Sequence, residues 1–290
     1  MCSSDLSTTL RIESAGGGTC EIEWIIYEFS AGVTVQHIDT TSPSGVTRDF
    51  TISAINLSIA FCIMGIQWGQ SFWSSNSSLY WEFTSTTNLR ATTGGGTGGS
   101  GNGVNGQVIE YSGATVQSAD FTVSNLTDTF SITAVDQTKA LTITSQHISG
   151  AAEASQWDFS NDTTLRSRRG DSSSRDGHYF VVEFPEFEVQ RGYENIGSGA
   201  SNKNISISAV SDLTQSFTTW INHGGATPGD GANNDPEQFM IRSKFNSTTE
   251  INIARYQGGN DYDVAWNVFE FVGSAKTPDL TPAAQMSHMA

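Results

Sequence analysis

The sequence predicts an all-β protein made of tandem β-sandwich-like repeats, with three complete units and an N-terminal half unit. Composition is the first observation that predicts this class. Of the 290 residues, 37% are apolar and 10% aromatic, which is enough to build packed cores, whereas only 15% are charged. Long solvated helices need Glu, Lys and Arg, so a coiled coil or helical bundle is disfavoured. The abundant Ser, Thr, Asn and Gly favour strands and turns instead.

Internal similarity is the second observation. Four segments contain an apolar strand that closes on a glutamate followed by an aromatic residue, and the glutamates are Glu28, Glu110, Glu183 and Glu270. A Thr-Thr element with Leu-Arg and then a glycine-bearing loop precede three of them, while the fourth copy has Asn252 in place of the arginine. Three copies also share an opening strand, seen at 52–55, 132–135 and 207–210. The repeating unit is therefore about 75–80 residues long, a period typical of repeat architectures.

These spacings divide the chain into five parts. We expect a half-repeat at 1–39, repeats at 40–120, 121–196 and 197–275, and a C-terminal tail at 276–290. A lone hairpin leaves an unpaired edge and an uncovered apolar face. The half-repeat is therefore expected either to complete the last unit in the same chain or to dock on a neighbouring chain.

Within each repeat, the Leu-Arg strand is expected to fold back through the glycine loop onto the glutamate strand. This hairpin would place Arg11 opposite Glu28, Arg90 opposite Glu110 and Arg166 opposite Glu183, as cross-strand pairs. Because the residues next to each glutamate are apolar, we expect the glutamate strand to be central in its sheet and buried on both faces.

The net charge of the chain disfavours two classes of binding partner. Fourteen basic residues against thirty acidic ones give a net charge of −16, which repels nucleic acid and anionic membranes. The apolar run 52–66 is shorter than the roughly 20 residues of a membrane helix. Its counterparts in the other repeats have the composition of a soluble β-hairpin, so we expect one here. We also expect no secretory signal, because the first residues include no basic and then apolar region.

Few residues suggest chemistry. The five histidines lack metal-ligand spacing, so no zinc site is expected, and His178 is interpreted as a turn or packing residue. The acidic loop 230–237, with Asp261 and Asp263, is either a calcium site or a set of solvated turns. Cys20 and Cys62 either form a bridge or, like Cys2, remain free thiols. Because the glutamates recur once per unit, they are expected to be structural rather than a catalytic carboxylate pair, and no other catalytic or cofactor-binding residue is predicted.

Two surface candidates remain. One is an aromatic cluster that either stacks on sugar rings or forms a protein interface, or else packs in the core; its members are Trp68, Phe72, Trp73, Tyr80 and Trp81. The other is a basic cluster that either contacts an acidic neighbour or is a solvated loop; its members are Arg166, Arg168, Arg169 and Arg175.

The Thr-Thr-x-Leu-Arg element, the glycine loop and the Val-Val-Glu-Phe strand together resemble the β-rich repeats of tailed-bacteriophage virion surface proteins, namely capsid decoration (cement) proteins and tail-fibre modules. The resemblance implies a non-enzymatic structural protein on the virion exterior, assembled in the host cytoplasm. Its partners would be other virion proteins such as the major capsid protein, and further copies of the chain in an oligomer or lattice. The alternative is a tail-fibre or adhesin module that binds host-surface glycan, and a repeat-built hydrolase comes third.

Overall fold

The computed structural model describes residues 32–41, 47–67, 79–93, 103–147, 155–170, 172–222, 241–255 and 262–272. These residues form six three-stranded antiparallel sheets and one short 3-10 helix, η2 (Leu213–Gln215), and no α-helix occurs among them. The all-β class is therefore confirmed. Nor does this part of the chain contain a helix of the length and apolarity needed to cross a membrane.

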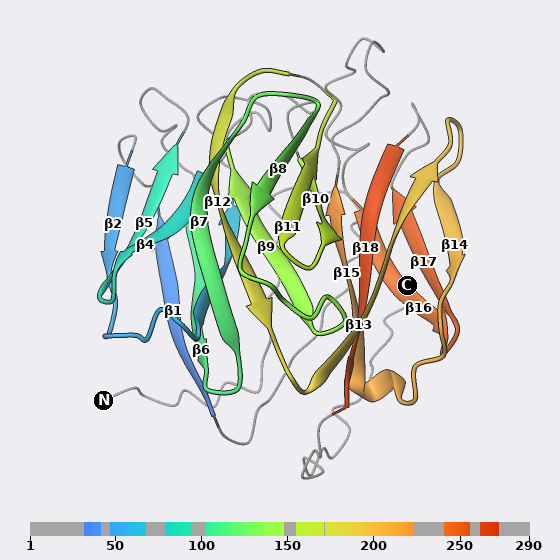
Figure 1. The fold of residues 1–290 in the computed structure, drawn as a ribbon, viewed down its shortest axis with the longest axis horizontal. Coiled ribbons are helices and arrows are strands. Elements are labelled where there is room, and N and C mark those ends of the chain that lie inside the picture. Colours follow the sequence, from blue (N-terminus) through green and yellow to red (C-terminus); the bar gives the residue numbers. More distant parts are fainter. Residues whose placement is uncertain are drawn as a thin grey trace.

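The sheets fall into three successive groups, which follow one another from blue through green to red in Figure 1. Group 1 contains β1 (Val33–Thr41), β2 (Thr47–Thr51), β3 (Ala60–Gln67), β4 (Leu79–Ser85), β5 (Asn88–Thr93) and β6 (Gly103–Tyr111). Group 2 contains β7 (Thr115–Val123), β8 (Thr127–Ser131), β9 (Ala140–Gln146), β10 (Gln156–Asn161), β11 (Thr164–Arg168) and β12 (Arg175–Glu183). Group 3 contains β13 (Phe187–Ile196), β14 (Asn202–Ser206), β15 (Ser216–Asn222), β16 (Ile241–Ser247), β17 (Glu250–Arg255) and β18 (Tyr262–Phe271).

The same pairing occurs in all three groups. The first, sixth and third strands form one sheet, and the second, fifth and fourth form the other. The unit boundaries expected from the sequence stay a prediction, and in each group the first strand begins before the expected start of the repeat. Most of the expected half-repeat 1–39 and the whole tail 276–290 lie outside the described residues.

The cores lie between the two sheets of a group. One cluster fills group 2 around Trp157 and Leu165, and another fills group 3 around Ile251 and Ile253. A third cluster combines the core of group 1 with side chains from groups 2 and 3, as Phe180 of β12 illustrates. Each fully buried side chain of this kind contributes about 1.5–3 kcal/mol of hydrophobic stabilisation.

The three glutamate strands that the structure describes, β6, β12 and β18, are the central strands of their sheets, as predicted. Along β12, Tyr179 and Val181 belong to the core of group 2, whereas Phe180 and Val182 belong to the cluster shared with group 1. Both faces of this strand are therefore buried, because alternate side chains point to opposite faces of a sheet.

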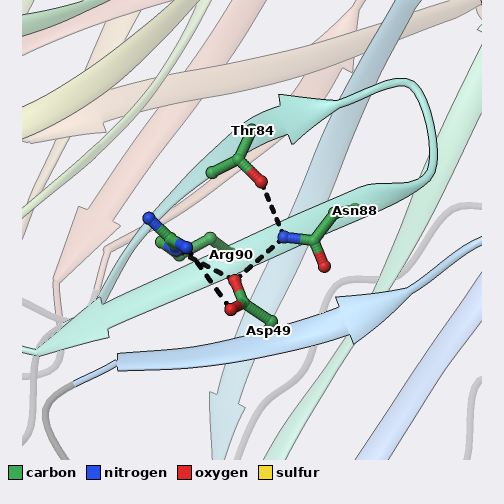
Figure 2. Close-up of polar contacts among 4 residues, drawn as sticks. All are labelled: Asp49, Thr84, Asn88 and Arg90. Atoms are coloured by element: carbon green, nitrogen blue, oxygen red, sulfur yellow. Dashed lines mark hydrogen bonds and ion pairs between the residues drawn. The ribbon is translucent and has the colours of Figure 1, made fainter.

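The predicted hairpin between the arginine strand and the glutamate strand is wrong. β5 and β6 lie in different sheets, so Arg90 lies opposite Asp49 of β2 and Glu82 of β4, while Glu110 lies opposite Thr34 and Ala60. Figure 2 shows the observed ion pair, in which Nε of Arg90 lies 2.9 Å from Oδ1 of Asp49.

Group 2 has the same arrangement. Arg166 lies opposite Asp158 and Thr129, whereas Glu183 lies opposite Thr115 and Ala140 of a different sheet. The predicted Arg166–Glu183 pair is therefore also wrong. The third predicted pair, Arg11 with Glu28, lies outside the described residues.

The true hairpin is closed by the Thr-Thr element itself, which joins the fourth strand to the fifth. A side-chain oxygen two residues back accepts a hydrogen bond from the backbone N–H of a threonine of this element: Ser85 Oγ from Thr87 N at 3.2 Å, and Asn161 Oδ1 from Thr163 N at 2.9 Å. Such side-chain turns close a short loop locally. A short loop costs less chain entropy than the long glycine loop, which connects the two sheets instead.

The apolar run 52–66 contains the connection between β2 and β3 and most of β3. It is not the expected hairpin, because β2 and β3 lie in different sheets. Ile52 and Ile55 are buried in the connection, and Cys62 is buried in β3. Cys62 is a free thiol whose pKa is raised by burial, so it does not form the alternative bridge to Cys20. Cys2 and Cys20 themselves lie outside the described residues.

Candidate functional site

In each group a glutamine of the first strand makes two hydrogen bonds to the backbone of one residue in the connection between the second and third strands, and we call this pair of bonds the glutamine clasp. In group 1, Gln36 Nε2 donates to Ser53 O at 3.1 Å, and Ser53 N donates to Gln36 Oε1 at 2.6 Å. The same two bonds join Gln117 to Thr133 and Gln190 to Ser208, with lengths of 2.7–3.0 Å. The clasp therefore fixes the connection between the second and third strands, where the Ser-Ala or Thr-Ala pattern lies in the sequence.

The recurring glutamates hold the same connections. Glu110 Oε1 accepts from Asn56 N at 2.7 Å, Glu183 Oε2 from Asp136 N at 3.2 Å, and Glu270 Oε1 from Ser211 N at 2.6 Å. These bonds give the glutamates a structural role, with loop amides as their partners in place of the predicted arginines. Such charge-assisted bonds are among the stronger ones in proteins.

Neighbouring groups meet edge on face. The fourth strand of one group lies across the outer face of the first-sixth-third sheet of the next, so β4 contacts β9 and β12, and β10 contacts β15 and β18. At the first contact, Trp81 N donates to Ser145 Oγ at 3.0 Å, and the rings of Phe83 and Phe180 lie 5.6 Å apart between centroids. At these two contacts an edge strand of one group thus meets a sheet face of the next.

The contact between groups 1 and 2 assembles a cluster of Glu82, Asp120 and His178. One ligand-type atom from each lies within 4.8 Å of the others. His178 is buried, and its Nδ1 lies 2.7 Å from Asp120 Oδ1. Burial, followed by the charge of Asp120, raises the pKa of Glu82, which His178 and Arg90 partly offset.

Carboxylates and imidazole are donors that divalent cations accept. In this cluster, however, Nδ1 of His178 already has Asp120 as its partner. The arrangement is therefore a hydrogen-bonded pair beside a second carboxylate. Sequence reasoning missed it because the three residues come from β4, β7 and β12, and no spacing along the chain connects them.

The contact between groups 2 and 3 contains two of the four arginines of the predicted basic cluster. Arg166 makes two hydrogen bonds to the carboxylate of Asp158, at 2.9 and 2.7 Å, and Arg168 lies 3.0 Å from the same carboxylate. The Arg168 guanidinium also lies over the ring of Tyr193, 5.2 Å from its centroid. These arginines therefore contact an acidic residue of their own chain.

The other two arginines of the cluster are separate from this contact. Arg169 is buried and donates from Nε to Asn125 O at 2.9 Å. Arg175 donates from Nη1 to Ser174 O at 2.7 Å. The structure therefore disperses the four arginines instead of presenting them as one loop surface.

A further arginine, which the sequence did not single out, crosses the same contact. Arg191 of β13 lies over the ring of Phe159, 4.7 Å from its centroid. Its Nη2 also donates to the carbonyl oxygens of Gln137 and Ala140 in group 2. Burial lowers the pKa of Arg191 to about 10. The only sequence signal was its position directly after a repeated Val-Gln pair.

The structure describes two of the five residues of the predicted aromatic cluster. Trp81 is buried, with 4% of its surface exposed, and packs against Phe50, so it is a core residue. Tyr80 is half-buried, with its ring 5.6 Å from that of His147 in an edge-on contact. Trp68, Phe72 and Trp73 lie outside the described residues.

The predicted calcium loop has a similar outcome. The loop 230–237 and Asp261 lie outside the described residues. Asp263 lies in β18, where its Oδ1 accepts a hydrogen bond of 2.7 Å from Asn195 Nδ2.

Comparison with known proteins adds no relative to this geometry. No family model matches the chain, and no curated protein was found with significant similarity to it.

Proposed function

We propose that this chain is a non-enzymatic structural protein on the exterior of a phage virion, of the capsid decoration (cement) type, which bridges and stabilises neighbouring subunits. The observation that carries the proposal is the use of polar side chains at the described contacts. The recurring glutamates hold loop amides, and Asp158 holds Arg166 and Arg168. These carboxylates are thus occupied in holding the sheets together.

The packing between groups supports the same proposal. An edge strand lies across the face of the next sheet, which is a contact that a neighbouring molecule can repeat. Group 1 also exposes large apolar side chains on its outer sheet, with Val35 37% and Ile63 53% exposed. Exposed apolar side chains that lie on one sheet face favour a protein interface.

The experiment that tests the proposal uses particles from the phage that encodes this chain. We expect peptides of the chain in purified particles, and we expect particles assembled without it to release their genome at a lower temperature. Particles that lack the chain, or that are equally heat-resistant without it, would contradict the proposal.

A tail-fibre or adhesin module that binds glycan is the alternative. Trp81 cannot serve as a sugar-stacking residue in such a module, because its side chain is buried in the core. Retention of the purified chain on a host-surface glycan column, combined with absence from capsids, would favour this alternative over the decoration protein.

A further inference from the structure

We propose that copies of this chain associate head to tail, with β16 of one copy lying across the outer face of the β1–β6–β3 sheet of the next, so that Lys244 meets Asp39. The inference deepens the proposed structural function by naming a second copy as a partner, and its biological meaning rests on that function.

The outer face of the β1–β6–β3 sheet is the first element of the argument. In groups 2 and 3 the equivalent face is covered by β4 and β10, respectively. Val116 and Val189, which precede the clasp glutamines of those groups, are 9% and 8% exposed. Their counterpart Val35, which precedes Gln36, is 37% exposed.

The third strand of the sheet gives the same comparison. Ile63 lies three residues after Ala60, which pairs with Glu110, and Ile143 lies three residues after Ala140, which pairs with Glu183. Ile143 is half-buried and packs in the cluster shared between groups 1 and 2, whereas Ile63 is 53% exposed. Within the described residues, the face of group 1 thus carries the same apolar positions without the same cover.

The covering strand presents one side chain that recurs in register. Glu82, Asp158 and Lys244 each precede a phenylalanine at the point where the fourth strand bulges. They pair across the hairpin with Arg90, Arg166 and Asn252, respectively. We call these three residues the contact position.

The receiving sheet has a matching position, three residues after each clasp glutamine. Its members are Asp39, Asp120 and Tyr193. In the first observed contact the two positions are neighbours, because Glu82 and Asp120 lie in one cluster. In the second contact Arg168 joins the two positions, since it pairs with Asp158 and lies over the ring of Tyr193.

Repeating this geometry between copies places Lys244 of group 3 beside Asp39 of group 1. Both side chains belong to exposed residues, and their charges are opposite. The contact within the chain at Glu82 and Asp120 instead brings together two carboxylates. The pairing between copies is therefore electrostatically better matched than the one it repeats, and complementary charge of this kind determines register and partner choice.

The symmetry of the association follows from the surfaces. The contact joins two different surfaces, the fourth strand of group 3 and the outer sheet of group 1. Contacts of this type add copies in series until they close a ring, or they continue as an open chain. Either form continues, from molecule to molecule, the edge-on-face packing that connects the groups within one chain.

The test measures the mass of the full chain in solution over a range of concentrations, by sedimentation equilibrium. We expect concentration-dependent association that weakens about tenfold when either Asp39→Lys or Lys244→Asp reverses one charge. The doubly substituted chain carries both changes and should recover most of the association. Glu188→Lys changes the net charge as much as Asp39→Lys at another exposed position, and it should leave association unchanged.

A chain that stays monomeric at every concentration would overturn the inference. Association that neither substitution weakens, or that the double substitution does not restore, would also overturn it. The particle experiment is independent of this one. Self-association without presence in particles would leave the inference standing and refute the proposed function, and the converse would do the reverse.

Discussion

The contact between groups 1 and 2 and the contact between groups 2 and 3 share one geometry and differ in chemistry. In the first, Glu82 lies beside Asp120, so two acids share a site with His178. In the second, Asp158 is held by two arginines, and Arg191 reaches across to backbone carbonyls. The backbone arrangement therefore determines where groups meet, and single side chains determine how strongly and at which pH they do so.

The largest effect should come from Arg191, which belongs to the second contact alone. Replacing it with methionine keeps part of the apolar stem but leaves the carbonyl oxygens of Gln137 and Ala140 without this donor. We expect the free energy of unfolding in urea to fall by about 2–3 kcal/mol. If the difference between the contacts lies elsewhere, Arg191→Met will cost no more than Glu188→Met at an exposed site.

The carboxylate of Asp158 should have the next largest effect. Asp158→Asn removes the charge that pairs with Arg166 and Arg168, at a site where these side chains are 22–31% exposed. We expect a loss of about 1 kcal/mol in urea unfolding, reduced in high salt because screening weakens ion pairs.

Asp49→Asn is the matched control for this change. It removes the more exposed pair that Asp49 makes with Arg90, which Figure 2 shows. Its effect should be smaller than that of Asp158→Asn. Equal losses from the two substitutions would mean that the position of Asp158 at a contact between groups adds nothing.

The comparison also shows which parts of the molecule a sequence can reveal. Composition and the internal repeats predicted the all-β class. The apolar residues next to each glutamate predicted a central strand buried on both faces, as around Phe180 and Val182, because a strand that is buried on both faces has apolar side chains at consecutive positions. The partner of Arg90 was not predictable in this way. The length of the loops did not reveal which strands they pair. The Thr-Thr turn joins β4 to β5 in a hairpin that places Arg90 opposite Glu82, whereas the glycine loop connects β5 to a strand of the other sheet.

The side chains at the contacts were harder to predict for a different reason. Glu82, Asp120 and His178 come from separate strands of two groups, so their proximity depends on how whole sheets pack. Arg166 and Arg168 were identified as a basic cluster, but the Asp158 carboxylate that holds them lies on the neighbouring strand β10. A strand register has to be known before such pairs can be named.

The smallest effect, and the one that most directly separates the two contacts, concerns pH. The folded protein raises the pKa of Glu82 through burial and the charge of Asp120, against the opposing charges of His178 and Arg90. The folded state therefore holds this proton to a higher pH than the unfolded state does. Stability from this group is present at acid pH and is lost as pH rises through the raised pKa.

Glu82→Gln should remove that dependence and stabilise the chain slightly at neutral pH, by about 0.3 kcal/mol, because solvent screens a site that is only partly buried. The measurement is a series of urea unfolding curves from pH 4 to pH 8, with Glu188→Gln as the exposed control. A parallel pH profile for the wild-type and Glu82→Gln chains would mean that folding does not raise the pKa of Glu82. The difference between the two contacts would then reduce to the arginines of the second contact.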